Sequence, residues 1–490
     1  MKRKPFILST LSVAILGILL IASCKKDNQK VGDDRSLNAG TLASGCLDAL
    51  PATDSVITGL INTDLYLSNA RRYKLSGIVY VTAGHTLTIQ HGTRILGLAG
   101  TSTVPGGGLV ITRGAKINAV GLPDCPIVFT SYRYDDTSVP DSTKSGDWAG
   151  IIILGRATVN NAPIGTDSLR IEGIPDGFPG SPYYGGNNDA DNSGTLSYVR
   201  IEYAGFELSP DNEINGLTLG GVGSGTIIDY VAVTESRDDA FEWFGGSVNA
   251  SHLIAINALD DMFDTDNGYN GTISYAVGIA DKVRADKSQS NGIESDNIVS
   301  GITTSRITHP RYNNLTIVGV QNTARASDTS GIGRYGRGAH LRRNAEFEIN
   351  NSIIMGYNYG ISLDSALGNT PGKYRSGIST ITHTFAHGFG TPITTGATSI
   401  PYATESNGVA AVGTRFSTST WFHAQAILAA NANTGIKNTN PNGSGWLSNP
   451  FNSPLTVPNL ASIGLAANYG SKIDTWNLGA TPNRWLQVSW

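Results

Sequence analysis

Short segments of this sequence recur at a spacing of about 22 residues. The run Asp-Asp-Ala-Phe-Glu at 238–242 returns as Asp-Asp-Met-Phe-Asp at 260–264. Similar pairs at this spacing are 86–95 with 108–117 and 253–256 with 275–279. Tyr198 and Tyr230 open similar runs about 32 residues apart, as if one coil carried an extra loop of about ten residues. A fixed period of this length, built from short alternating apolar segments, is typical of a solenoid.

A coil of this length has a perimeter of about 70 Å, because a strand rises about 3.3 Å per residue. That perimeter suits three short strands and three turns. A leucine-rich repeat would show a Leu-x-x-Leu frame and helical segments, and a propeller blade would need a longer repeat of four strands. The 59 glycines and the low charged content of 15% favour short strands joined by tight turns. We therefore predict an all-β fold, a single-stranded right-handed parallel β-helix over residues 46–365, followed by irregular terminal coils and a cap over residues 366–490.

The N-terminus predicts export and lipid attachment. Lys2, Arg3 and Lys4 precede an apolar run over residues 6–21, which is too short to span a membrane. Small residues then lead to Cys24, in a pattern similar to the bacterial lipobox. We predict a signal peptide over residues 1–23 and a lipidated, flexible tether over residues 24–45, which would place the protein at the outer membrane or cell surface. A plain signal peptide with an incidental cysteine, or a short membrane anchor, is the alternative.

Two further cysteines, Cys46 and Cys125, remain. An even pair in an exported protein favours a disulfide, which would close the first coils, although two buried thiols would also fit. The formal net charge of −4 and the lack of a basic run argue against a nucleic-acid partner. We expect a monomer.

Four motifs together resemble a group of surface lipoproteins from Bacteroidota and spirochaetes. They are Gly146-Asp147-Trp148 with the run to Gly155, the acidic turn 189–194, the strand 198–205 and the segment 238–246. The resemblance covers roughly residues 60–365. It implies a fold that belongs with the pectate-lyase-like β-helices, and it implies little about function.

The turn at 189–194 predicts a calcium site. Asp189, Asp191 and Ser193 offer oxygens at alternate positions, and Gly194 follows, as at the start of a calcium-binding loop. The match is incomplete because Arg200 stands where a bidentate Glu would close the loop. The alternative is a loop of Asx-turns.

The repeated acidic run predicts a second cation site. In a 22-residue register, Asp238 lies near Asp260, Asp239 near Asp261, and Glu242 near Asp264, with coils about 4.8 Å apart. Like charges so close repel and raise the carboxyl pKa values unless a cation neutralises them. The alternative is that the side chains fan into water. The candidate calcium ligands of both sites are Asp189, Asp191, Ser193, Glu242, Asp264 and Asp266.

Arginines dominate the segment that follows. Only Asp328 opposes the arginines at positions 306, 311, 325, 334, 337, 342 and 343. Guanidinium groups suit the carboxylates or sulfates of an acidic polysaccharide. Alternatively, the basic coils form lateral salt bridges with the acidic ones.

These features favour a cell-surface lipoprotein with a binding or structural role, glycan-binding or adhesin-like and stabilised by calcium. The alternative is a polysaccharide lyase or glycoside hydrolase acting on an acidic glycan, since paired carboxylates can act as acid and base and the resemblance to pectate lyases suggests calcium with an arginine base. The candidate catalytic residues are Asp238, Asp239, Glu242, Asp261, Asp264 and Arg342.

Overall fold

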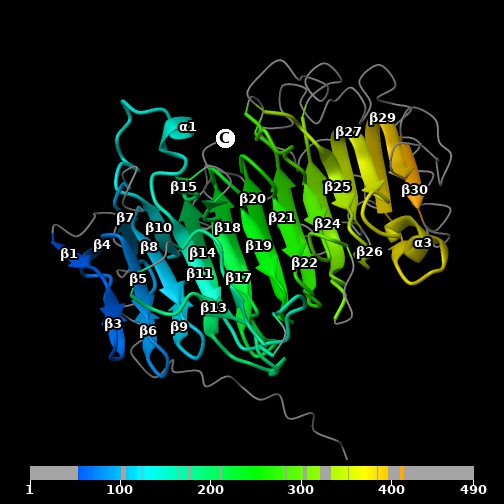
Figure 1. Cartoon of the computed structure of the whole chain (residues 1–490). Helices are drawn as coiled ribbons and strands as arrows, with labels where there is room; N and C mark the ends of the chain where they lie inside the picture. Colours follow the sequence, from blue (N-terminus) through cyan, green and yellow to red (C-terminus); the bar gives the residue numbers. More distant parts are fainter. Residues whose placement is uncertain are drawn as a thin grey trace, which may run out of the picture. The chain divides into compact units, whose positions relative to one another are not determined.

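The computed structural model describes residues 53–395 and 409–412, apart from 101–105, 124, 164, 175–176, 178, 210–211, 282–283, 302–305, 321–332, 351 and 383. Twenty-six strands form one continuous sheet that winds as a right-handed parallel β-helix with three faces. Figure 1 shows the strands of successive coils side by side from β1 to β30. The predicted fold class is confirmed.

Each coil contributes one segment to each face. The first face begins with β1 (Asp54–Ile57), β4 (Arg72–Leu75), β7 (Arg94–Gly97) and β10 (Ile127–Ser131). The second face contains β2 (Leu60–Ile61), β5 (Ile78–Val81), β8 (Gly108–Ile111), β11 (Gly150–Leu154), β17 (Leu217–Gly220), β19 (Phe241–Phe244), β21 (Phe263–Asp266), β23 (Ile293–Ser295) and β25 (Arg337–Leu341). The third face contains β3 (Leu65–Leu67), β6 (Thr86–Ile89), β9 (Lys116–Val120), β26 (Glu348–Asn350) and β28 (Thr380–Thr382).

In later coils some strands bend around a corner and serve two faces. From the third face to the first run β14 (Gly194–Glu202), β18 (Ile227–Thr234), β20 (Ala250–Ile256), β22 (Thr272–Ile279) and β24 (Arg311–Val318). From the first face to the second run β27 (Ile353–Leu363) and β29 (Thr384–Thr395), and β30 (Val409–Val412) pairs antiparallel with β29. Outside the coils lie the pairs β12 (Leu169–Arg170) with β13 (Tyr183–Tyr184) and β15 (Glu207–Ser209) with β16 (Asn212–Glu213), and the helices α1 (Asp141–Lys144) and α3 (Thr370–Arg375).

The core fills the interior of the coils. Alternate residues of each strand point inward, so like side chains stack from coil to coil. Phe241 lies opposite Phe263 in the parallel register, with ring centroids 5.5 Å apart. Trp148 is fully buried, and its indole N–H donates to the carbonyl of Glu202 at 2.7 Å. One continuous cluster of buried apolar residues therefore runs through the coils.

A column of rings marks the corner between the third and first faces. Tyr198, Tyr230, His252 and Tyr275 occupy the same position in four coils, each with a positive φ between 51° and 56°. Neighbouring ring centroids lie 4.4, 4.2 and 5.4 Å apart, with nearly parallel planes. Stacking of the rings therefore offsets the free-energy cost of the positive φ angles at this corner.

Replacing Tyr230 by alanine should lower the free energy of unfolding by about 1–3 kcal/mol, because two ring contacts are lost while the positive φ remains. Tyr230→Phe keeps the ring and serves as the control. Urea unfolding measures both variants. Equal stability of Tyr230→Ala and the wild type would show that the column does not stabilise the coil.

Three expectations from the sequence need correction. The segments 86–95 and 108–117 do not lie in register, because Ile95 pairs with Phe129 and Ile117 with Leu87. They form different corners, since 86–95 runs from the third face to the first and 108–117 from the second to the third, but both combine alternating apolar residues with a turn glycine. Ala276, one position beyond the expected residue, pairs with Leu253. Regular coils also continue past residue 365, since β28 and β29 pair in parallel with β26 and β27.

Cys125 is disulfide-bonded. Its predicted partner Cys46, the signal peptide, Cys24 and the tether lie outside the described residues, so these remain predictions. Within the described part of the chain, no helix is long and apolar enough to cross a membrane.

Candidate functional site

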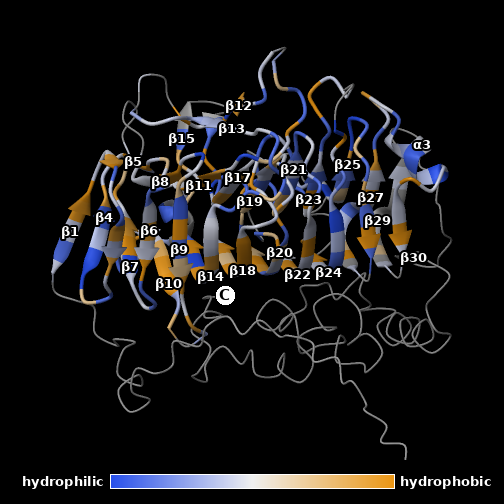
Figure 2. Ribbon diagram, turned by 90° about the horizontal axis from the view of Figure 1, so that it is seen from below, coloured by the Kyte–Doolittle hydropathy of each residue, from blue (hydrophilic) through white to orange (hydrophobic). Residues whose placement is uncertain are grey.

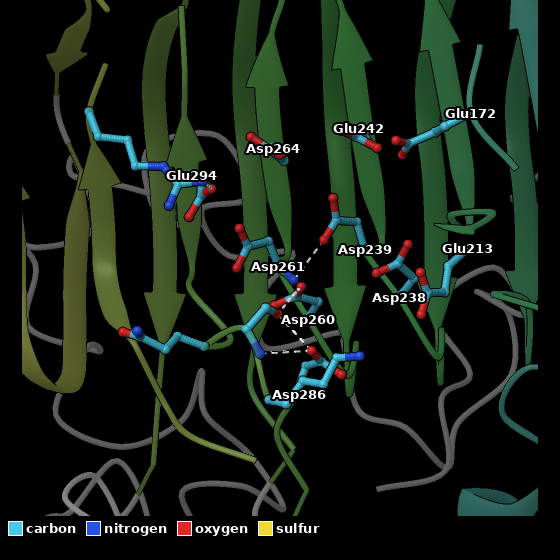
Figure 3. A pocket seen from close by; sticks show the side chains of 14 residues that line it. Glu172, Glu213, Asp238, Asp239, Glu242, Asp260, Asp261, Asp264, Asp286 and Glu294 are labelled. Carbon is cyan, nitrogen blue, oxygen red and sulfur yellow. Dashed lines mark hydrogen bonds and ion pairs between the residues drawn. The ribbon is translucent and has the colours of Figure 1, made fainter. Parts of the chain in front are cut away.

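A groove of about 260 Å³ lies against the outer side of the second face. Its walls come from coil residues and from three segments outside the coils: the excursion between β11 and β14, the β15–β16 hairpin and the loop after β22. Figure 3 shows their carboxylates converging on this space. The lining residues are Glu172, Glu213, Asp238, Asp239, Glu242, Asp260, Asp261, Asp264, Asp286, Lys287, Ser288, Gln289, Glu294 and Arg342.

The groove begins where the outward side chains of the second face change from apolar to polar and acidic. In β5, β8 and β11 these positions hold Tyr80, Val110 and Ile152, which are buried beneath the excursion together with Ile171 and Tyr184. Figure 2 shows β12 and β13 lying beside these strands. From β17 onward the same column continues as Thr218, Glu242, Asp264, Glu294 and His340. The excursion thus closes one end of the groove.

A ladder of side chains forms the floor at the corner before the second face. Asn215, Asp239, Asp261 and Asn291 belong to four successive coils. The backbone N–H of Asp239 donates to Asn215 Oδ1 at 3.2 Å, that of Asp261 to Asp239 Oδ1 at 2.8 Å, and that of Asn291 to Asp261 Oδ1. Asp239 therefore uses one oxygen for the next coil and has a second oxygen for a ligand, whereas Asp261 Oδ2 also accepts from Asn291 Nδ2 at 3.4 Å.

The two asparagines also orient the glutamates of the groove. Asn215 Nδ2 donates to Glu242 Oε2, and Asn291 Nδ2 donates to Glu294 Oε2 at 2.9 Å. These amides fix the glutamate side chains without supplying positive charge. The carboxylates consequently stay close together although they repel one another.

Among the residues that the structure describes, three sets of three carboxylates converge closely enough to hold a metal ion. One oxygen from each residue lies within 4.8 Å of the others in the first triad (Asp238, Asp239, Asp260), the second triad (Asp239, Glu242, Asp264) and the third triad (Asp261, Asp264, Glu294). Asp239 belongs to the first and second triads and Asp264 to the second and third. Carboxylate oxygens at this spacing are the ligands that hard divalent cations such as calcium prefer.

The third triad differs from the others because basic residues compensate it. Glu294 pairs with Arg342 and also lies 3.4 Å from His340 Nδ1. Burial alone would raise the pKa of Glu294, but the His340 hydrogen bond and the charge of Arg342 outweigh burial and lower it. None of the five carboxylates in the first two triads forms an ion pair with a described residue. Those two triads are the better candidates for a metal ion.

Unsatisfied oxygens in the groove fit a cation. Asp260 Oδ1 and Asp264 Oδ1 are buried and have no hydrogen-bond partner among the described residues. Burial, reinforced by neighbouring carboxylates, raises the pKa values of Asp239, Glu242 and Asp261 well above the ordinary range, and burial raises that of Asp260 to about 7. A buried polar atom without a partner is costly, and a bound cation would remove that cost.

Glu172 and Glu242 form a carboxyl pair at the upper end of the groove. Their carboxyl groups point toward one another in Figure 3, and the pKa values of the two groups are influenced by each other. The side chain of Glu172 is exposed at the groove mouth, but the protein atoms around it disfavour its charged form and raise its pKa to about 7. This pair can hold a proton near neutral pH.

Arg342 is not available as a general base. Besides Glu294, its Nε lies 2.7 Å from Asp296 Oδ1, and these carboxylates raise the pKa of the guanidinium group. Arg343 pairs with Asp296 as well. The salt bridges of these two arginines thus run to Glu294 and Asp296, which lie beyond the acidic run at 238–264. Of the other predicted arginines, Arg325 lies outside the described residues.

The acidic turn at 189–194 lies apart from the groove. Asp189 Oδ1 accepts the backbone N–H of Thr158 at 2.9 Å and Arg306 Nη1 at 2.8 Å, and Asp191 Oδ2 accepts the N–H of Arg156 at 3.0 Å. These carboxylates fasten the excursion to neighbouring segments, as expected of Asx-type turns. A calcium ion bound by Asp189, Asp191 and Ser193 remains a prediction.

Only two of the six predicted calcium ligands line the groove. Glu242 and Asp264 line the groove, whereas Asp266 does not; its Oδ1 accepts the N–H of Asn267 at 2.6 Å. All six candidate catalytic residues line the groove. Sequence reasoning missed Glu172, Glu213, Asp286 and Glu294. Glu294 could have been found by continuing the column beyond Asp264, whereas the other three come from segments without a repeat.

Comparison with protein families identifies the group to which this fold belongs. The model of a pectate-lyase-like β-helix domain matches residues 59–445. The chain belongs to this family. The match extends past residue 365, in agreement with the coils formed by β28 and β29. Comparisons with curated proteins and with solved structures found no match.

Proposed function

We propose that the groove binds divalent cations, calcium first among them, and serves as the glycan-binding site of a lipid-anchored cell-surface protein. The observation that carries this proposal is the pair of uncompensated triads joined by Asp239. Five carboxylates held within two adjacent coils are poorly stable without a counter-charge.

Calcium fits these ligands for three reasons. It takes six to eight oxygens in a flexible geometry, so it accepts carboxylates supplied by successive coils. The ladder leaves Asp239 one oxygen for an ion, so further coordination positions remain for water or for sugar hydroxyls. Ser288 and Gln289 add neutral hydrogen-bonding groups on the groove wall.

The negative charge of the groove also restricts which glycans can bind. Without cations, the carboxylates would repel the uronate or sulfate groups of an acidic glycan. With cations bound, the same oxygens would hold ions that acidic groups can coordinate. We therefore expect binding of an acidic glycan to depend strictly on calcium, whereas a neutral glycan would bind through its hydroxyls with weaker dependence.

A glycoside hydrolase is the second candidate, and the Glu172–Glu242 pair favours it. A carboxyl group with a pKa near 7 beside another carboxyl can act as a general acid at neutral pH. A lyase that uses Arg342 as its base is less well supported, because that side chain is held by Glu294 and Asp296.

A glycan screen separates these functions. The purified protein is incubated with neutral and acidic polysaccharides, in calcium or in EDTA, and both binding and new reducing or unsaturated ends are measured. We expect calcium-dependent retention of an acidic glycan without product. Product formation that Glu172→Gln abolishes would replace the binding role with hydrolysis. Absence of both binding and products would contradict the glycan proposal.

The lipid anchor has its own test. Incorporation of a radiolabelled fatty acid in cells should depend on Cys24, and Cys24→Ala should make the protein extractable from membranes by alkaline carbonate, which removes peripheral contacts. Membrane retention of Cys24→Ala without label after this extraction would instead support a membrane anchor formed by the N-terminal apolar segment.

A further inference from the structure

The first coil exposes an apolar side chain on each of its three faces. Val56 in β1, Leu60 in β2 and Tyr66 in β3 point away from the core and are 62%, 44% and 58% exposed. We call these three residues the apolar rim. Their register partners in the second coil are Lys74, Tyr80 and Thr88, of which the tyrosine is buried. The apolar rim is therefore confined to one end of the coil stack.

Basic side chains adjoin the apolar rim. Residues 53–100 contain Arg71, Arg72, Lys74 and Arg94 against two acidic residues, although the whole chain is net negative. Arg71 is exposed, and Lys74 lies directly opposite Val56 in the sheet register. Lys74 and Arg72 share one acidic partner, Asp54, at 2.6 and 2.7 Å, so the cluster keeps an excess of positive charge. Long basic side chains beside exposed apolar groups are typical of surfaces that sit at a bilayer interface, because the stems lie along the acyl boundary while the charges reach the headgroups.

We propose that the apolar rim and its basic neighbours contact an anionic bilayer end-on. The inference rests on the predicted lipid at Cys24, because the chain that leads from this residue enters the coils at β1, the strand that carries Val56. A single lipid tether would let the coils reorient freely, and the apolar rim would hold their first end at the membrane.

A second copy of the chain fits less well as the occupant. Two copies meeting end to end would bring the exposed Arg71 of one chain towards that of the other, and this repulsion would oppose the contact.

Vesicle binding tests the proposal on a chain that carries Cys24→Ser and so lacks the lipid. The protein is sedimented with vesicles of phosphatidylcholine alone or with added phosphatidylglycerol, in EDTA and without glycan. We expect binding to the anionic vesicles. Val56→Ser combined with Tyr66→Ser should weaken it by about tenfold, because less apolar surface enters the interface.

Ile378→Ser is the matched control, since Ile378 is 51% exposed but lies in the last coils. It should bind the vesicles as the parent does. No vesicle binding by the parent, or equal weakening by the rim and control variants, would overturn the proposal. Dimerisation in sedimentation velocity that the rim variant abolishes would assign the apolar rim to a second copy. The assay contains no calcium or glycan, so its result is independent of the groove.

Discussion

Asp239→Asn is expected to weaken calcium binding by at least about a hundredfold, because the substitution removes a negatively charged ligand from both uncompensated triads at once. The fold should survive. Asparagine keeps the Oδ1 that accepts the backbone N–H of Asp261, and asparagine already occupies both ends of the same ladder. Isothermal titration calorimetry measures the change.

The matched control is Asp229→Asn. Asp229 lies in β18, on the third face, where it contacts Ser251 and His252, away from the groove. Its variant also loses one negative charge and should bind calcium as the wild type does. Equal weakening in both variants would show that calcium responds to total charge. Unchanged binding in Asp239→Asn would remove the two triads from the account.

In the presence of a chelator, the melting temperature should fall by roughly 10 °C or more between pH 4 and pH 8. Burial and neighbouring carboxylates raise the pKa values of Asp239, Glu242, Asp261 and Asp264 in the folded protein. The folded state therefore binds protons more tightly than the unfolded state. Stability is highest near pH 4, where these groups are protonated, and decreases as the pH rises towards about 7, the pKa of Asp260.

Acidic groups with lowered pKa values act in the opposite direction at lower pH. The His340 hydrogen bond lowers the pKa of Asp364 to about 2, so its contribution is lost only as the pH falls below 4. Calcium should restore most of the stability lost at pH 8. Thermal melts in EDTA and in calcium measure both effects. In EDTA, the melting temperature of Glu242→Gln should depend less steeply on pH than that of the wild type. Rising stability between pH 4 and pH 8 in EDTA would contradict the account.

The repeat predicted the parts of the groove that obey it. Asp239 and Asp261 share a ladder, and Glu242 and Asp264 share a column, because a parallel register places equivalent positions of successive coils over each other. The same periodicity predicted a wrong pairing between the segments around Gly92 and Gly114, because the two corners have similar sequences. A period states that two turns are alike without saying which corner of the coil each one forms.

The remaining groove residues could not be placed from the period. Glu172 comes from the excursion after β11 and Glu213 from β16, and both segments have tertiary positions set by packing against the second face. The apolar column of Tyr80, Val110 and Ile152 fixes the excursion, and this column is visible only once the register of β5, β8 and β11 is known. The compensation of Glu294 by Arg342 likewise depends on coils of unequal length.

The central claim is that divalent cations occupy the groove between the ladder and the second face. Anomalous diffraction from crystals soaked in manganese, which stands in for calcium at oxygen ligands, tests it directly. The account predicts an anomalous peak within coordination distance of Asp239, together with Asp238 and Asp260 or with Glu242 and Asp264. A fully soaked crystal without a peak in the groove would contradict it.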